Sequence, residues 1–472
     1  MRFLDIIKQN QKEILIGEIG AMLHDIGKAH PDFIRSKSIE EIKGLPHHAR
    51  GIDKLLKPEL IELFKNIKIN IDNEEKTIYD LISLHHNAKG KILKYLESCD
   101  HLQSADDKGI VRKKQPLDNV LISSPFGFNK EKIDLANQQK SLDDLQSNLI
   151  GLFQKYLNES LDIKCFRKCL FNNLKTTFSH SLGETRISSN DVTLWDHTFS
   201  TAAVFKSILC AIALGEKPDS KEIKWSVLGF CWDGIGFINK GRKIADILER
   251  NKIIEKIKRE LEDKFENEFP IGNVIYEDNN GIYFTFPPFP ELIEELDKDK
   301  RKHVAKECAE YGLKIIREKS YNEIFPFFTL SKPSRALTII ADELKFASTK
   351  RNIPKMSPVL FIKDGEKRIE EKIDDNPDMP SSNNNEDICP VCKLRPKEEK
   401  EERCGICKER MLGRLTQWLN DRNNTIWTEE VADKNNRLAL LTLNFDLDKW
   451  LDGTMVGTIF SQSFDDWCSC NK

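Results

Sequence analysis

The sequence has no hydrophobic run long enough to cross a bilayer. Its most apolar stretch, around Ala202 to Leu214, is broken by Lys206 and is shorter than the roughly 20 residues that a membrane-spanning helix needs. The N-terminal segment MRFLDIIKQNQKE carries Asp5 and has no small-residue cleavage site, so we expect no signal peptide. These absences predict a cytoplasmic protein with no membrane partner.

A surplus of charge of either sign is missing as well. The 73 Lys and Arg residues nearly balance the 76 Asp and Glu residues, and the formal net charge is -3. A uniformly basic coat for nucleic acid is therefore excluded, and any nucleic-acid surface has to be a local patch. The 472 residues are 39% hydrophobic and 32% charged, which is typical of a globular chain with roughly two to four domains.

Cysteine is too scattered to form a disulfide framework. Of the 12 cysteines, four form two C-x-x-C pairs, Cys389-Pro-Val-Cys392 and Cys404-Gly-Ile-Cys407, and most of the others stand singly. This usage indicates a reducing compartment. Four thiolates at this spacing predict a closed tetrahedral zinc site of the ribbon type. A redox-active C-x-x-C is the alternative, but the surrounding βαβ pattern that it needs is missing.

Hydrophobic periodicity separates a helical first part from a mixed second part. Residues 1–220 are mostly helical in pattern, and one buried helix face is predicted from Ile14, Leu15, Ile19, Met22, Leu23 and Ile26. A β-rich run over 225–231 is then followed by a charged helix over 241–265. Two further β-rich runs flank Asn280-Gly281, which is a hairpin signal. Strand, helix and hairpin in this order begin a ferredoxin-like αβ sandwich.

We therefore predict an α+β multidomain protein. Helices are expected to resume over 291–350, and a further helix is expected over 411–419. The predicted segments are an all-α domain over 1–115, a helical connector over 116–220, a ferredoxin-like domain with helical insertions over 221–364, a flexible linker over 365–388, a zinc ribbon with a helix over 389–425, and the start of an incomplete further domain over 426–472.

Histidines gather near the N-terminus, where seven of the ten fall within the first 101 residues. The sharpest motif is His24-Asp25-Ile26-Gly27-Lys28 at the end of an apolar helix, and the candidate ligands that follow it are His47-His48, His85-His86 and Asp100. Imidazole and carboxylate groups suit divalent transition metals. Such a metal lowers the pKa of bound water and polarises a phosphoryl oxygen, as phosphodiester hydrolysis requires. Lys28 is placed to contact a phosphate. The alternative is that the His-Asp pair occurs by chance.

Two further acids, Asp446 and Asp448, follow a predicted hydrophobic strand over 437–445. Residues i and i+2 of a strand point to the same face, so the two carboxylates together suit Mg²⁺. The alternative is an ordinary turn at the end of a strand.

In this order the motifs resemble the large, palm-bearing subunit of type III CRISPR effector complexes. His24 to Lys28 is similar to the HD motif of that family, Ser83 to His86 to its His-His helix, and Ser98 to Ala105 to its metal-ligand helix. The Asp196-His197 helix resembles one that is structural in the family, so no catalytic role is expected for His197. The zinc knuckles and the 441–448 strand occupy the places of the family's zinc element and second palm.

The resemblance implies an HD nuclease that hydrolyses single-stranded DNA, with Mn, Ni, Fe or Mg at the HD site and Zn at the four cysteines. The implied metal ligands are His24, Asp25, His48, His85, His86 and Asp100, and the choice between His47 and His48 stays open. The implied partners are the RNA-guided effector subunits and, indirectly, target RNA. Residues 221–364 correspond to a degenerate first palm.

The family also makes cyclic oligoadenylate from ATP at its second palm. This chain carries only the first acids of that site, so we expect it to need a complete second palm for ATP/Mg chemistry. Two other readings stay open. One is a stand-alone HD-type nucleotide phosphohydrolase, and the other is a non-catalytic scaffold whose HD site has decayed.

Overall fold

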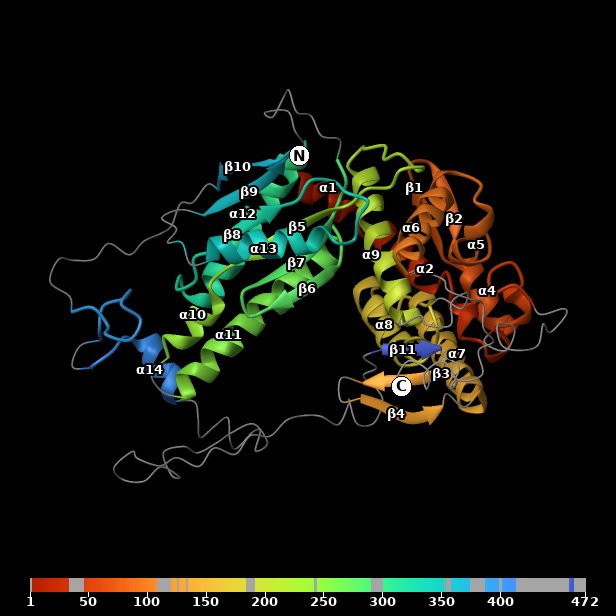
Figure 1. Cartoon of the computed structure of the whole chain (residues 1–472), viewed down its shortest axis with the longest axis horizontal. Helices are drawn as coiled ribbons and strands as arrows, with labels where there is room; N and C mark the ends of the chain where they lie inside the picture. Colours follow the sequence, from red (N-terminus) through yellow and green to blue (C-terminus); the bar gives the residue numbers. More distant parts are fainter. Residues whose placement is uncertain are drawn as a thin grey trace, which may run out of the picture.

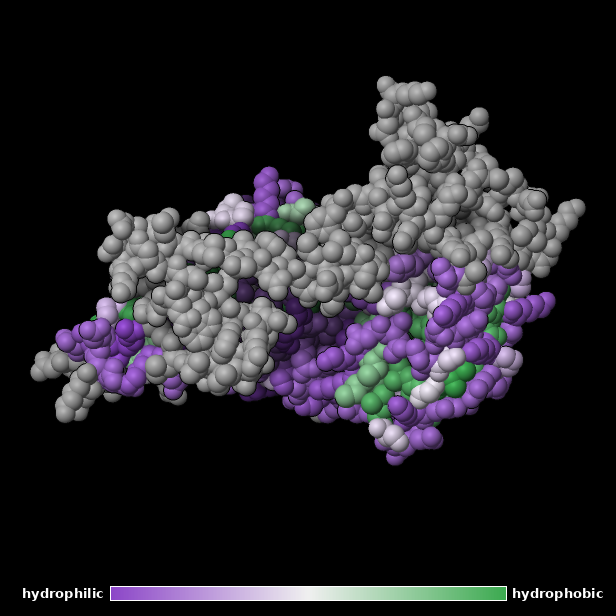
Figure 2. All heavy atoms as spheres, turned by 90° about the horizontal axis from the view of Figure 1, so that it is seen from below, coloured by the Kyte–Doolittle hydropathy of each residue, from purple (hydrophilic) through white to green (hydrophobic). Residues whose placement is uncertain are grey.

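The computed structural model consists of a helical lobe and a sheet lobe (Figure 1). It describes residues 2–33, 46–107, 120–124, 127–132, 135–183, 192–241, 244–289, 300–351, 353, 358–373, 387–398, 401–412 and 458–461. Among these, no helix is both long and apolar enough to span a membrane. Where described residues are visible from below, Figure 2 shows mostly hydrophilic residues with smaller hydrophobic areas among them.

The helical lobe extends from residue 11 to residue 213. Its helices are α2 (Gln11–Leu23), η1 (Ile26–Ala29), η2 (Ile52–Lys54), α4 (Pro58–Asn66), α5 (Ile78–Ser83), η3 (His85–Asn87), α6 (Lys91–Asp107), α7 (Leu135–Leu157), α8 (Ile163–Ser179) and α9 (Leu194–Ala213). The short helix α1 (Phe3–Gln9) precedes this lobe and packs against α12 (Lys300–Ser320) of the sheet lobe, where the Phe3 amide donates to Glu307.

Helix α2 is the central element of the helical lobe and is buried on every side. Residues 14–23 are all buried, because α5, α8 and α9 pack around the helix. The prediction of a single buried face was therefore too narrow. Gly17 and Gly20 make this packing possible, since a Cβ at either position would clash with Leu209 of α9 or Leu81 of α5.

The prediction of an all-α domain over 1–115 is wrong, because a β-hairpin lies inside it. Strands β1 (Lys68–Ile71) and β2 (Glu74–Thr77) pair in antiparallel fashion. Asp72 and Asn73 form the turn with φ of 52° and 59°, the left-handed geometry of a two-residue hairpin. A short three-stranded sheet, in the order β11 (Thr458–Ser461), β3 (Val120–Ser124), β4 (Gly127–Lys132), also interrupts the predicted helical connector.

The sheet lobe is built on a six-stranded sheet in the order β10-β9-β8-β5-β7-β6. Its elements are β5 (Ser226–Cys231), α10 (Gly234–Asn239), α11 (Ile244–Glu262), η4 (Asp263–Glu268), β6 (Val274–Asp278), β7 (Gly281–Phe286), α12, β8 (Phe327–Leu330), α13 (Ile339–Arg351), β9 (Val359–Asp364) and β10 (Lys367–Lys372). The predicted strand, helix and hairpin are all present. Strands β5 to β8 and the helices between them have the βαββαβ connectivity and antiparallel pairing of a ferredoxin-like unit.

Three boundaries in the second part of the chain differ from the predictions. Strand β8 interrupts the helices expected over 291–350, because it completes the ferredoxin-like sheet beside β5. The linker expected over 365–388 begins as β10, an edge strand whose charged residues suit its exposed position. The helix expected to begin at Met411 begins earlier, as α14 (Gly405–Leu412), directly after Cys404, and residues 413–419 lie outside the described residues.

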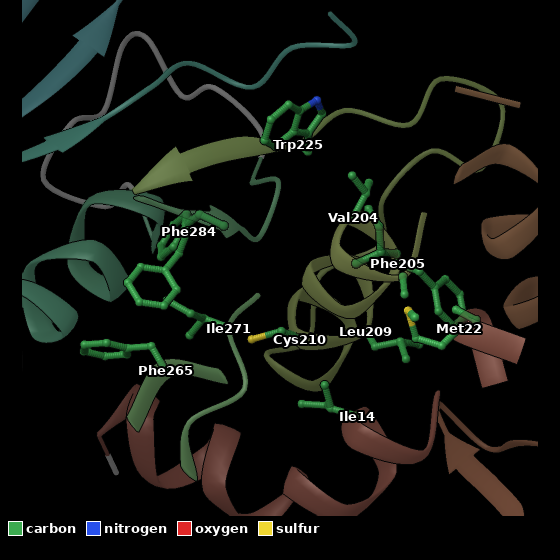
Figure 3. Packing of buried hydrophobic residues seen from close by; sticks show 14 of the residues in the cluster. Ile14, Met22, Val204, Phe205, Leu209, Cys210, Trp225, Phe265, Ile271 and Phe284 are labelled. Carbon is green, nitrogen blue, oxygen red and sulfur yellow. The ribbon is translucent and has the colours of Figure 1, made fainter. Parts of the chain in front are cut away.

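Helix α9 connects the two lobes by packing against both. In Figure 3, Leu209 and Phe205 of α9 lie toward Met22 of α2, while Cys210 lies toward Ile271 of the sheet lobe. Contacts of α9 with α2, α6 and α8 on one side and with β7 on the other agree with this view. The segment that is apolar nearly all round is therefore a buried helix, as its composition predicts.

One ionic network crosses the interface between the helical lobe and the sheet lobe, which is called the seam below. Arg167 of α8 donates two hydrogen bonds to Glu18 of α2, both 2.7 Å long, and lies 2.9 Å from Glu266 of η4. Lys206 of α9 lies 3.0 Å from Glu18 and donates to Asn273, which precedes β6. Burial lowers the pKa of Lys206 to about 8, so the ammonium is still mostly charged at neutral pH.

We predict that Lys206→Met destabilises the protein by about 3–5 kcal/mol, because it leaves a buried carboxylate without one of its two cations. Urea unfolding measures the change. The matched control is Lys8→Met, which removes an exposed ion pair to Glu268 and should cost less than about 1 kcal/mol. Equal shifts for the two variants would contradict the role of the network.

Candidate metal centre

The HD motif lies where α2 ends and the chain turns into η1. His24 is the C-cap of α2 and Asp25 precedes η1. A distant segment approaches this turn closely at Gly27, where a Cβ would collide with the His48 carbonyl. The glycine of the motif therefore permits the close approach that places the His48 ring beside Asp25.

Side chains from five segments converge on Asp25, which is fully buried. Its Oδ1 lies 3.2 Å from His48 Nε2 and 3.6 Å from His85 Nε2. Its Oδ2 lies 3.4 Å from both His24 Nε2 and His197 Nε2. These distances join residues that are far apart in sequence around one carboxylate.

Asp100 and His86 complete the cluster at its two sides. Asp100 Oδ1, on α6, lies 3.1 Å from His197 Nε2 and 4.0 Å from His24 Nε2. His86 Nε2 lies 3.1 Å from His48 Nε2. All six predicted ligands thus lie in one cluster.

The backbone orients two of the imidazoles for ligation. Nδ1 of His24 bonds to the Ala21 carbonyl at 2.6 Å, and Nδ1 of His85 bonds to the Ile82 carbonyl at 2.8 Å. A carbonyl can only accept, so each Nδ1 carries the proton and each Nε2 presents a lone pair to the cluster. Both Nε2 atoms are buried and have no hydrogen-bond partner among the described residues, which is the arrangement of a metal-binding histidine.

The donor atoms fall into two groups that share Asp25. One group is Asp25, His48, His85 and His86, and the other is His24, Asp25, Asp100 and His197; the ligand atoms of each group lie within 4.8 Å of one another. Imidazole nitrogens with one or two carboxylates fit Mn, Fe, Ni or Zn well, while a mainly nitrogen donor set suits Mg less well. The residues present therefore fit a divalent transition metal at each group.

His197 is the residue that the sequence analysis missed. It was expected to be structural, yet it is 2% exposed and its Nε2 faces both acids of the cluster. The available signal was its position on the most apolar helix of the chain, where a buried imidazole needs a polar partner. The family resemblance instead implied a structural role for the helix that carries His197.

His48 and not His47 belongs to the cluster. His47 is exposed, stacks on the His48 ring at 4.3 Å, and accepts at Nδ1 from the Ala49 amide. Burial lowers the pKa of His48, and burial and the neighbouring His85 lower the pKa of His86 to about 3. Both of these imidazoles are therefore neutral at physiological pH, which is the form that ligates metal.

Lys28 is the cation nearest to the acids of the cluster. Its Nζ lies 2.6 Å from Asp25 Oδ2 and donates to the Gly183 carbonyl. Burial would raise the pKa of Asp25, but the Lys28 ammonium holds that pKa well below its usual range. Burial likewise acts to raise the pKa of Asp100, and a hydrogen bond from His197 helps to keep it low. Both carboxylates are thus ionised and able to bind a cation.

The four cysteines form a second, separate cluster. The sulfurs of Cys389, Cys392, Cys404 and Cys407 lie within 4.8 Å of one another, and all four residues are buried. Four thiols converging in this way fit a tetrahedral zinc site. Asp446 and Asp448 lie outside the described residues.

Comparisons with known proteins found similar solved structures at low sequence identity. No family model matches the chain, and no curated protein matches it in sequence. Its structure is similar to a Csm1-Csm4 cassette solved in complex with cA3, at 14% identity and a TM-score of 0.45, over 72% of this chain and 48% of that chain. A cassette solved with one ATP gives 13% identity and a TM-score of 0.46, over 72% and 49%.

Csm1 from T. onnurineus is similar at 14% identity and a TM-score of 0.44, over 74% of this chain and 50% of that chain. The chain thus spans about half the length of the solved chains that it matches. Another similar structure is a Csm1-Csm4 subcomplex of the type III-A CRISPR-Csm interference complex.

We predict that His197→Ala weakens Mn²⁺ binding at least about tenfold, because it removes a possible metal-ligating nitrogen that faces both Asp25 and Asp100. Isothermal titration calorimetry on metal-free protein measures the affinity. His180→Ala is the control, since the His180 ring bonds to the Thr176 carbonyl and lies outside both groups. An unchanged Mn²⁺ affinity in His197→Ala would contradict a ligand role for His197 and support the structural role that the sequence predicted.

Proposed function

We propose that this chain belongs to a type III CRISPR large subunit, and that its helical lobe is a metal-dependent HD nuclease acting on single-stranded DNA in the cytoplasm. The observation that carries the proposal is the convergence of His24, Asp25 and Asp100 with four further imidazoles. Together these side chains form two groups of possible metal ligands. The order of the motifs along the chain supports the CRISPR assignment.

The chain's own residues bind and orient a phosphodiester in this proposal. A divalent metal held by the cluster would lower the pKa of a bound water and polarise a phosphoryl oxygen. Lys28, whose side chain is 13% exposed beside Asp25, is placed to bind a phosphate oxygen. Side-chain exposure rises from 0% at His24 and His85 to 11% at His48, and Arg50 and His47 are exposed. Substrate would therefore approach from the His47 side.

In this proposal the remaining segments either support the structure and bind ATP or act only when the second palm is complete. Residues 221–364 form a degenerate first palm that helps to bind ATP, and the four cysteines hold zinc. Asp446 and Asp448 belong to a second palm that makes cyclic oligoadenylate only when it is complete. The proposed partners are the RNA-guided effector subunits and, through them, target RNA.

Degradation of labelled single-stranded DNA with Mn²⁺ or Ni²⁺ tests the nuclease. We expect metal-dependent cleavage that falls at least a hundredfold in Asp100→Asn, because the variant removes one of the two carboxylates of the group formed by His24, Asp25, Asp100 and His197. His101→Ala is the matched control, because it changes the adjacent, exposed residue on the same helix. Equal cleavage by both variants and the wild type would contradict the site assignment.

The same purified proteins distinguish the nuclease from the two alternatives, a nucleotide phosphohydrolase and a non-catalytic scaffold. A stand-alone nucleotide phosphohydrolase would hydrolyse mononucleotides and leave single-stranded DNA intact. A decayed scaffold would bind no metal at the cluster, and removing metal would leave its partner binding unchanged.

A further inference from the structure

A buried cluster of charges joins the cysteine ribbon to the sheet lobe. Its centre is Glu323, which follows α12 and is 4% exposed. Arg410 of α14 donates a hydrogen bond from Nη1 to Oε2 at 3.1 Å, and its Nη2 lies 2.9 Å from Oε1. Arg250 of α11 lies 3.1 Å from Oε2. Arg395, from the first knuckle, also pairs with Glu323 and donates to the Tyr321 carbonyl at 2.7 Å.

The charges of this cluster do not balance among its own side chains. Three guanidinium groups, of Arg250, Arg395 and Arg410, face two carboxylates, because Asp246 pairs with Arg250 at 3.0 Å. Nε of Arg395 and Nε of Arg410 are buried without an acceptor among the described residues. A buried excess of positive charge is costly unless an anion compensates it.

The cysteine cluster supplies that anion when it holds a metal. The Arg395 guanidinium also interacts electrostatically with the Cys392 and Cys404 sulfurs, so it lies between the ribbon sulfurs and Glu323. Four thiolates around one divalent cation leave two negative charges, whereas four neutral thiols leave none. Metal binding would therefore change the net charge across this interface from one positive to one negative charge and place an anion beside Arg395.

We propose that Arg395 and Glu323 form a metal-dependent latch: zinc at the four cysteines makes the ribbon sulfurs anionic, and Arg395 transmits this charge to the interface that attaches the ribbon to α11 and α12. Zinc binding and ribbon attachment are then reciprocally coupled. The latch rests on the proposed metal at the cysteines but does not depend on nuclease activity.

The first test uses the unmodified full chain with and without zinc, followed by hydrogen–deuterium exchange. Chelation should speed exchange in α14 and around Tyr321 to Glu323, while α2 in the helical lobe stays unchanged. Exchange around Glu323 that does not respond to zinc removal would overturn the latch. Failure of the chain to bind zinc at all would overturn the metal site as well.

The second test measures zinc affinity by competition with a chromophoric chelator. Arg395→Met should weaken zinc binding about 10–100-fold, as the loss of an outer-shell partner does, and Arg395→Lys should recover part of the loss. Lys408→Met is the control, because Lys408 is also a cation next to a ligand but pairs with Glu401 at the surface. Wild-type affinity in Arg395→Met would contradict the proposal independently of any nuclease result.

Discussion

The structure depends on one buried carboxylate, Glu18, and on the two cations that neutralise it. Glu18 lies in the fully buried helix α2, where an uncompensated charge would be strongly unfavourable. Arg167 and Lys206 reach it from α8 and α9, and the same two cations contact η4 and the residues before β6. The network therefore sets the mutual position of the helices and fixes the helical lobe against the sheet lobe.

The metal centre inherits its geometry from this arrangement. Helix α2 ends in the HD motif, and α9 carries His197 at its opposite end from the seam, so the register of the two helices places His197 Nε2 within 3.4 Å of Asp25. Asp25 in turn is the only residue shared by the two donor groups found among the described residues. A cluster of imidazoles around two ionised carboxylates has the charge and the ligand types of a transition-metal site.

Local patterns predicted much of the site but less of the fold. The HD motif, the paired histidines and the cysteine spacing were readable, because ligand chemistry restricts residue type and spacing. His197 was missed, because its partners are brought to it only by tertiary packing. The β1–β2 hairpin was missed although Ile69 and Ile71 alternate with polar residues before Asp72-Asn73, because the helical pattern around it dominated. Strand β10 was taken for linker, because an edge strand needs no hydrophobic face.

The central claim is that Asp25 joins two metal-binding groups. Counting bound Mn²⁺ by equilibrium dialysis of the wild type, Asp25→Asn and His86→Ala tests it most directly. The account predicts that Asp25→Asn abolishes all high-affinity binding at the cluster, because both groups lose a ligand. It predicts that His86→Ala impairs only the group of Asp25, His48, His85 and His86, and that the group containing His24, Asp100 and His197 stays occupied. Full Mn²⁺ binding by Asp25→Asn would contradict the account.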